Sequence, residues 1–202
     1  MNKRWMTLLA VAAVMPAAQA QSNDTGDWIV RARAVYLDSA NKDSTGLDLS
    51  VNNKTIPEVD ITYFFSPNVA AELILTYPQK HDIRAGSDKI GSLKHLPPTL
   101  TLQYHFTGMG WRPYVGAGIN YTRFSSVDFI PAVDTALKPS IDKNSFGLAF
   151  QAGVDVPLGG GWLLNLDVKK VQISTGVFSF GNKAGTFKVD PLLVGVGIGK
   201  RF

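Results

Sequence analysis

The sequence has no cysteine, and after residue 20 it has no long apolar run. Without cysteine, disulfides cannot stabilise the fold. Without an apolar run of about 18 to 20 residues, this part of the chain cannot cross a membrane as a helix. The formal charge is only +4, and no basic stripe with interleaved aromatic residues is present. The composition therefore gives no indication of nucleic-acid binding.

The first 20 residues have the organisation of an export signal. Lys3 and Arg4 precede an apolar stretch from Trp5 to Ala13, and Ala18-Gln19-Ala20 forms a small-x-small cleavage motif. The apolar stretch is shorter than the roughly 18 residues of a spanning helix. We therefore predict a signal peptide over residues 1–20 and an exported domain over residues 21–202.

The end of the chain is the most informative segment. Apolar residues occupy alternate positions from Leu192 to Ile198, mostly glycines lie between them, and the chain ends on Phe202. Because side chains alternate along a strand, this pattern predicts a strand with one apolar and one nearly bare face. A transmembrane β-barrel needs such a strand to pair with its first one, since lipid tolerates no open edge.

The same period-two pattern recurs through the chain. With the closing strand it predicts eight strands, each about 10 residues long. The other seven are Trp28–Tyr36, Ile56–Phe65, Val69–Tyr77, Pro97–Phe106, Arg112–Phe124, Ser145–Val156 and Trp162–Ile173. Short turns near Ser66, Gly108 and Gly159 alternate with four long polar connections. Small outer-membrane barrels have this format, with short periplasmic turns and longer extracellular loops.

A soluble β-sandwich is the alternative, because its strands also alternate. Two features count against it: the polar face carries charged residues, and the other face is apolar in nearly every strand. The apolar stripes would need a second sheet with a matching core. We therefore predict an all-β fold, an eight-stranded antiparallel transmembrane β-barrel of the bacterial outer membrane, in contact with lipid and lipopolysaccharide.

By parity, one set of polar side chains points into the bore. An eight-stranded bore is just wide enough for side chains to fill it, and buried charges must then pair. The predicted lumenal network consists of Arg31, Arg33, Glu58, Asp60, Glu72, Gln103, His105, Asn120, Gln151, Asp155 and Asp167. The alternative is a hydrolase site built on His105, but no recognisable nucleophile accompanies it.

Toward the extracellular end the inward face becomes apolar. The predicted channel-lining residues are Leu37, Leu49, Val51, Ile56, Ile74 and Phe124, with Lys169 near Ile74. These residues form either a small core that holds the loops together or a pocket for an apolar ligand. His81 and His95 flank a loop with Asp82 and Asp88, but their spacing gives no tight ligand set. We predict no metal and no cofactor.

Several longer motifs, at residues 95–106, 112–122 and 151–155, together with Val189-Asp190-Pro191 and the Arg201-Phe202 ending, resemble the outer membrane protein W family. The resemblance implies an eight-stranded barrel with a narrow, largely hydrophobic channel. It also implies uptake of small apolar molecules, with lateral release into the bilayer through a gap in the wall. Phe202 resembles the signal that the barrel-assembly machinery reads during biogenesis.

The leading hypothesis is therefore a non-enzymatic, passive channel for small hydrophobic or amphiphilic solutes. Lys169 stands where the family is expected to be more apolar, and a cation there would favour amphiphiles with an anionic head. One competing hypothesis is a non-transporting surface barrel that acts through its loops, in adhesion, stress or serum resistance, or phage or bacteriocin reception. The other is a lipid-A-modifying enzyme, which requires a converging nucleophile and base that the sequence does not show.

Overall fold

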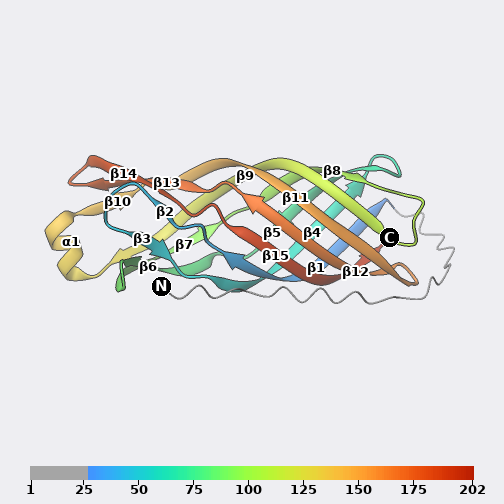
Figure 1. Ribbon diagram of the computed structural model, residues 1–202, viewed down its shortest axis with the longest axis horizontal. Coiled ribbons are helices and arrows are strands. Elements are labelled where there is room, and N and C mark those ends of the chain that lie inside the picture. Colours follow the sequence, from blue (N-terminus) through green and yellow to red (C-terminus); the bar gives the residue numbers. More distant parts are fainter. Residues whose placement is uncertain (1–26) are drawn as a thin grey trace, which may run out of the picture.

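The computed structural model describes residues 27–202, so the predicted signal peptide lies outside the described residues. Eight antiparallel strands form a closed wall (Figure 1). They are β1 (Trp28–Asp38), β4 (Lys54–Phe64), β5 (Val69–Leu75), β8 (Thr99–His105), β9 (Arg112–Phe129), β11 (Asn144–Gly159), β12 (Trp162–Val171) and β15 (Leu192–Arg201). β15 pairs with β1 along its whole length, and β9 pairs with β11. The closing strand predicted from the C-terminal alternation is confirmed.

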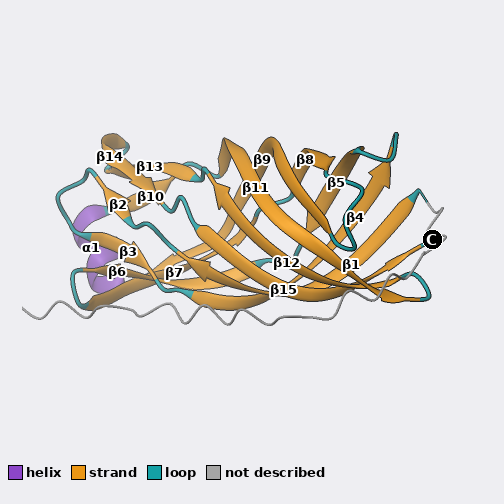
Figure 2. Ribbon diagram, turned by 45° about the vertical axis from the view of Figure 1, so that its right-hand side comes forward, coloured by secondary structure: helices purple, strands orange, loops and turns teal. Residues whose placement is uncertain are grey.

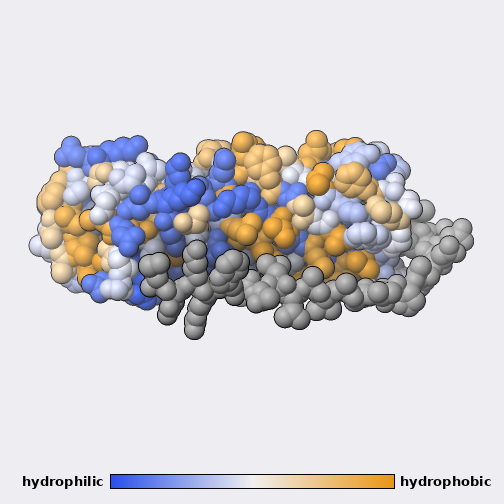
Figure 3. Space-filling view, viewed as in Figure 1, coloured by the Kyte–Doolittle hydropathy of each residue, from blue (hydrophilic) through white to orange (hydrophobic). Residues whose placement is uncertain are grey.

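Side chains of the wall alternate between the bore and the outside. In β1 every second residue from Ile29 to Leu37 is buried and the residues between them are exposed. The exposed positions of the wall are mostly apolar, and Ile119 and Phe146 are 57% and 76% exposed. Figure 3 shows these hydrophobic side chains over the wall. An apolar outside around a charged inside is the arrangement of a lipid-facing barrel and excludes the soluble sandwich.

The long connections differ from the prediction of polar loops, because they fold into an extension of the barrel. β6 (Gln79–Ala85) and β7 (Asp88–Leu96) form a hairpin that pairs with β3 (Leu49–Val51) and with the upper part of β9. A second sheet contains β2 (Lys42–Asp43), β10 (Pro139–Ile141), β13 (Ser174–Ser179) and β14 (Asn182–Lys188). The extension also carries α1 (Pro131–Leu137) and lies at the end of the barrel away from the C-terminal residue (Figure 2).

One apolar core stabilises the extension and continues into the top of the bore. It includes Leu37, Leu49, Val51, Ile56, Ile83, Leu93, Phe124, Val171, Phe187 and Leu193. Burial of these side chains, rather than strand propensity, stabilises the short strands of the extension. The helix within residues 27–202 is too short to cross a membrane.

Candidate functional site

The lower bore is filled by a polar plug that begins at Arg31 on β1. The guanidinium group holds Asp155 of β11 through two contacts, at 3.0 and 2.6 Å. It also contacts Asp60 of β4 at 2.8 Å and the Thr62 hydroxyl at 2.7 Å. Arg31 and Asp60 are fully buried. These contacts link β1 to β4 on one side and to β11 on the other.

Arg33, two residues further along β1, forms the centre of the plug. Its guanidinium lies 2.9 Å from Glu58, 2.7 Å from Asp60 and 2.9 Å from Glu72. Glu72 also accepts hydrogen bonds from the amides of Gln103 and Gln151, at 2.8 and 2.7 Å. Both oxygens of this buried carboxylate therefore meet donors, as a buried charge requires.

Lys169 forms the upper edge of the plug. Its ammonium group lies 2.6 Å from Glu58 and 2.9 Å from Asp167, and the side chain is 2% exposed. Asp167 also accepts a hydrogen bond of 2.8 Å from the Tyr114 hydroxyl. Two carboxylates thus balance the charge of Lys169. The sequence-based expectation that Lys169 attracts anionic head groups does not fit this geometry.

Glycines in the wall leave room for the plug. A Cβ at Gly153 of β11 would lie 2.4 Å from the Tyr114 ring. A Cβ at Gly197 of β15 would lie 2.1 Å from the Ala32 carbonyl and 2.7 Å from the Arg33 side chain. The nearly bare face of the closing strand therefore accommodates the arginines of its neighbour β1.

The remaining predicted network residues lie in the bore but outside the central ion pairs. His105 Nε2 is 2.8 Å from Gln103 Oε1, and its ring packs against Phe64 and Tyr114. Asn120 lies above the plug and donates a hydrogen bond of 2.8 Å to the Thr99 hydroxyl. The described partners of His105 are an amide and two aromatic rings, which is not the surrounding of a general base.

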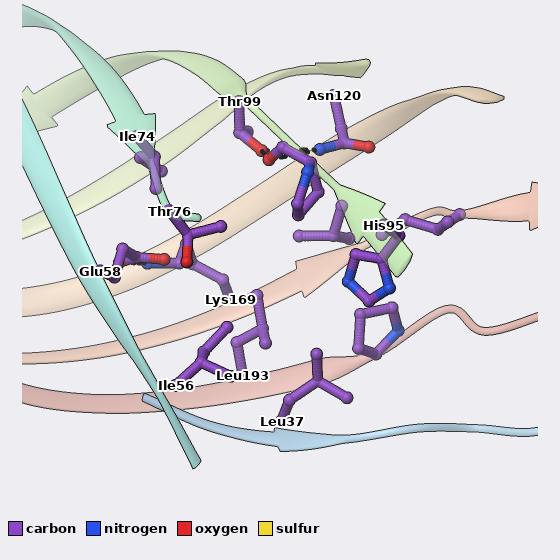
Figure 4. Close-up of a pocket in the computed structure, with 14 residues that line it drawn as sticks. Leu37, Ile56, Glu58, Ile74, Thr76, His95, Thr99, Asn120, Lys169 and Leu193 are labelled. Atoms are coloured by element: carbon purple, nitrogen blue, oxygen red, sulfur yellow. Dashed lines mark hydrogen bonds and ion pairs between the residues drawn. The ribbon is translucent and has the colours of Figure 1, made fainter. Parts of the chain in front are cut away.

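A small cavity of about 20 Å³ lies directly above the plug (Figure 4). The ion pair of Glu58 and Lys169 borders it on one side, and His95 borders it on another. Its other lining residues include Leu37, Ile56, Ile74, Val171, Ile173 and Leu193. A cavity of this size holds about one water molecule. The bore is therefore nearly closed at this level.

A second cavity of about 60 Å³ lies within the extension. Apart from Thr175, its lining is apolar and comes from β3, the β6–β7 hairpin, the end of β9, α1 and the second sheet. It includes Leu49, Val51, Ile83, Leu93, Phe129 and Phe187. The predicted channel-lining residues thus divide between two levels. Leu37, Ile56, Ile74 and Lys169 line the lower cavity, whereas Leu49 and Val51 line the upper one.

An aromatic group belongs to the core that links the two levels. The rings of His81 and His95 stack with centroids 4.7 Å apart, and Phe124 meets His95 edge-on at 6.4 Å. His81 Nδ1 lies 2.9 Å from the Asn52 carbonyl oxygen. Burial, with a smaller contribution from His81, lowers the pKa of His95 to about 3. His95 is therefore a neutral imidazole at physiological pH.

The wall has an unpaired seam beside the lower cavity. The pairing of β5 with β8 stops at Ile74 and Thr99, and the pairing of β6 with β7 starts at Gln79 and His95. Between these points, no backbone hydrogen bond of the described chain joins residues 76–78 to residues 96–98. Three of these six residues are prolines, which cannot donate to a ladder. Thr76 and Pro97 line both this seam and the cavity.

Sequence parity missed several residues of the site. His95, Val171, Ile173 and Leu193 line the lower cavity, and Tyr114 bonds within the plug. The period-two pattern did place Tyr114 on the inward face of its strand. His95 gave no such signal, because the sequence pattern predicts a polar connection at the hairpin that carries it. Among residues 27–202, no three His, Asp or Glu side chains are placed to hold a metal ion.

A closed eight-stranded wall with an apolar outside, a charged plug and an extracellular extension defines a transmembrane β-barrel of the outer membrane. The family model for the OmpW family matches residues 24–202, so the chain belongs to the OmpW family. Its family membership and its barrel fold, both predicted from the sequence, are confirmed.

Relatives and solved structures agree with this assignment. Outer membrane protein W of Vibrio cholerae is 36% identical over 83% of this chain and 83% of its own length. The outer-membrane protein y4mB of Sinorhizobium fredii is 38% identical, with 94% and 86% covered. The crystal structure of OprG from Pseudomonas aeruginosa matches with a TM-score of 0.77 at 28% identity, over 88% of this chain and 96% of that one.

Proposed function

We propose that this protein is a passive outer-membrane channel for small, uncharged hydrophobic molecules. The observation that carries the proposal is the pair of apolar cavities that share one core, above a plug of paired charges. Transfer of an apolar solute from water to such a lining is favourable, because it removes apolar surface from water. The balanced charge of Lys169 removes the reason to expect anionic amphiphiles.

The proposed route runs from the extension into the lower cavity and then sideways into the bilayer. The plug closes the straight path, because Arg31, Arg33 and their carboxylates fill the bore and are buried. The exit we propose is the seam between residues 76–78 and 96–98, where the wall lacks backbone hydrogen bonds at the level of the lower cavity. Tyr77 in this seam is 52% exposed, as expected for the aromatic girdle at the outer membrane surface.

The name of one relative supports the proposed class of solute. The Pseudomonas aeruginosa protein PahQ, 27% identical over 83% of this chain, is named a dibenzothiophene metabolism operon protein. Dibenzothiophene is an uncharged, fused aromatic molecule. A solute of that kind matches the apolar lining of both cavities.

The test is uptake of naphthalene by whole cells, because their lipopolysaccharide slows the entry of apolar solutes. Ile74 lines the lower cavity and is 4% exposed, so Ile74→Arg should reduce protein-dependent uptake at least tenfold. Ser140→Arg, at an exposed position of the extension, is the matched control and should transport normally. Equal uptake by wild type and Ile74→Arg, at equal amounts in the membrane, would refute the proposal.

The same variants separate the channel from a surface barrel that acts through its loops. That alternative predicts that deletion of the β13–β14 hairpin abolishes a surface phenotype while Ile74→Arg has no effect. We further propose that the protein has no catalytic activity, since His105 is held by an amide and two rings in the bore. An unchanged mass spectrum of lipid A from cells with and without the protein is the expected result.

We propose lipopolysaccharide phosphates as partners of exposed cations just above the girdle. Lys80 and Lys94 stand directly opposite each other on the β6–β7 hairpin, and both are exposed. Like charges in this position repel, and an anion between them removes the repulsion. Adding lipopolysaccharide should therefore raise the melting temperature of wild type more than that of the double variant Lys80→Gln, Lys94→Gln. Equal shifts would refute this contact.

A further inference from the structure

His95 places an unpaired polar atom beside the lower cavity. The side chain is 2% exposed and lines that cavity (Figure 4). Its Nε2 has no hydrogen-bond partner among the described residues. A buried polar atom without a partner is unfavourable, and native proteins rarely leave one. The atom is therefore available to a group that enters the cavity.

The other polar groups that line the cavity are already paired. Lys169 and Glu58 bind each other, and the Thr76 hydroxyl donates to the Pro57 carbonyl at 2.8 Å. The Thr99 hydroxyl accepts from the Asn120 amide at 2.8 Å and donates to the Pro97 carbonyl at 3.2 Å. His95 Nε2 is therefore the atom that can bind an entering group, since the other polar side chains of the lining have partners and the rest of the lining is aliphatic.

We propose that His95 is a specificity-determining residue that selects apolar solutes carrying one hydrogen-bonding group, such as a hydroxyl or a carbonyl. The inference rests on the proposed channel and names its ligand class. The solute's polar group binds Nε2, and its apolar body packs against Leu37, Ile56 and Leu193. The resting cavity already has room for a group the size of one water molecule. The apolar body enters as the aliphatic side chains around it move.

A neutral imidazole suits this role. One ring nitrogen donates and the other accepts, so the ring can serve a hydroxyl or a carbonyl according to its tautomer. Burial keeps the pKa of His95 near 3, so the ring stays uncharged across the physiological range. A charged ring here would instead favour anions and oppose an uncharged solute.

The test compares two probes of nearly equal shape, 2-naphthol and naphthalene, with protein in detergent micelles. The chain has only three histidines, so ¹⁵N spectra of the imidazole rings resolve His95 from the others. We expect 2-naphthol to shift the His95 Nε2 resonance saturably. Naphthalene should shift only the methyl resonances of the cavity wall, and should bind about tenfold more weakly, the equivalent of one hydrogen bond.

Variants make the assignment specific. His95→Leu should remove the tenfold preference for 2-naphthol, because both probes then bind through their apolar bodies alone. His95→Gln should retain most of the preference. Ser140→Val, at an exposed position of the extension outside the lower cavity, is the control and should keep the preference. A preference that persists in His95→Leu would overturn the inference. Wild-type spectra in which 2-naphthol shifts the methyl resonances but not His95 would do the same.

Failure of the channel itself gives a different pattern. If neither probe shifts the methyl resonances of Leu37 or Leu193 in wild type, the cavity takes up no apolar solute. The proposed function then fails, and the role of His95 fails with it. If both probes bind and only the preference is missing, the channel stands and His95 is a structural residue of the core.

Discussion

The charges of the plug predict how much stability is lost when a cation is removed and how this loss compares with the removal of a carboxylate. Three cations, Arg31, Arg33 and Lys169, face five carboxylates in the bore, namely Glu58, Asp60, Glu72, Asp155 and Asp167. Among these eight groups, negative charge is in excess. Arg33→Gln leaves two cations against the same five carboxylates, whereas Asp60→Asn leaves three against four.

Arg33 lies within 2.9 Å of three different carboxylates. Removing one partner of a single buried pair costs about 3–5 kcal/mol, because the other charge stays buried and uncompensated. We therefore expect Arg33→Gln to lower the free energy of unfolding by at least about 3 kcal/mol. Asp60→Asn relieves part of the excess negative charge and should cost less, about 1–3 kcal/mol.

The assay is urea unfolding of the barrel in lipid vesicles, followed by tryptophan fluorescence and by the shift in gel mobility on unfolding. Lys183→Gln, at an exposed position of β14, is the control and should change stability by less than about 0.5 kcal/mol. A loss below about 1 kcal/mol for Arg33→Gln would refute the reasoning. So would a larger loss for Asp60→Asn than for Arg33→Gln.

Three further predictions follow from the hairpin, the closing strand and the C-terminus. The folded pKa of His95, about 3, lies below its ordinary 6.5, so only the opened β6–β7 hairpin takes up a proton as the pH falls. His95 alone should make opening easier by about 1.4 kcal/mol per pH unit below 6.5. Hydrogen exchange of the hairpin amides should lose this part of the dependence in His95→Leu and keep the part that comes from the lowered pKa of His81. Gly197→Ala places a Cβ 2.1 Å from the Ala32 carbonyl and should lower the refolding yield, whereas Gly110→Ala, with open space around it, should not. Phe202→Ala keeps the two backbone hydrogen bonds with Trp28, so refolding in detergent should be normal. Because Phe202 resembles the signal that the barrel-assembly machinery reads, the amount in the outer membrane of cells should fall.

The apolar exterior and the charged interior could be predicted from local sequence, because a strand has a fixed period of two. Once Val30 and Ala32 are placed outside, Arg31 and Arg33 must point inward, whatever their partners are. The glycines of the last strand likewise predicted a face with no side chains. The reason for that face, room for Arg33 and its neighbours, became visible only when β15 and β1 were side by side.

The extension could not be predicted in the same way. Its strands are short, several have only two or three residues, and Lys and Asp occupy their exposed positions. They are stable because distant segments cover one another, as Leu49 of β3 and Phe187 of β14 do in one core. No window of the sequence contains that contact.

By itself, then, the sequence determined which face of each strand meets lipid, most of the charged residues of the plug, and that the last strand closes the wall. These properties follow from parity along single strands. Only the tertiary structure decided which charges pair, that Lys169 is neutralised by Glu58 and Asp167, and that His95 borders an apolar cavity with a free nitrogen. Each of these depends on residues from different strands meeting across the bore, and the distance between them is set by the closure of the barrel.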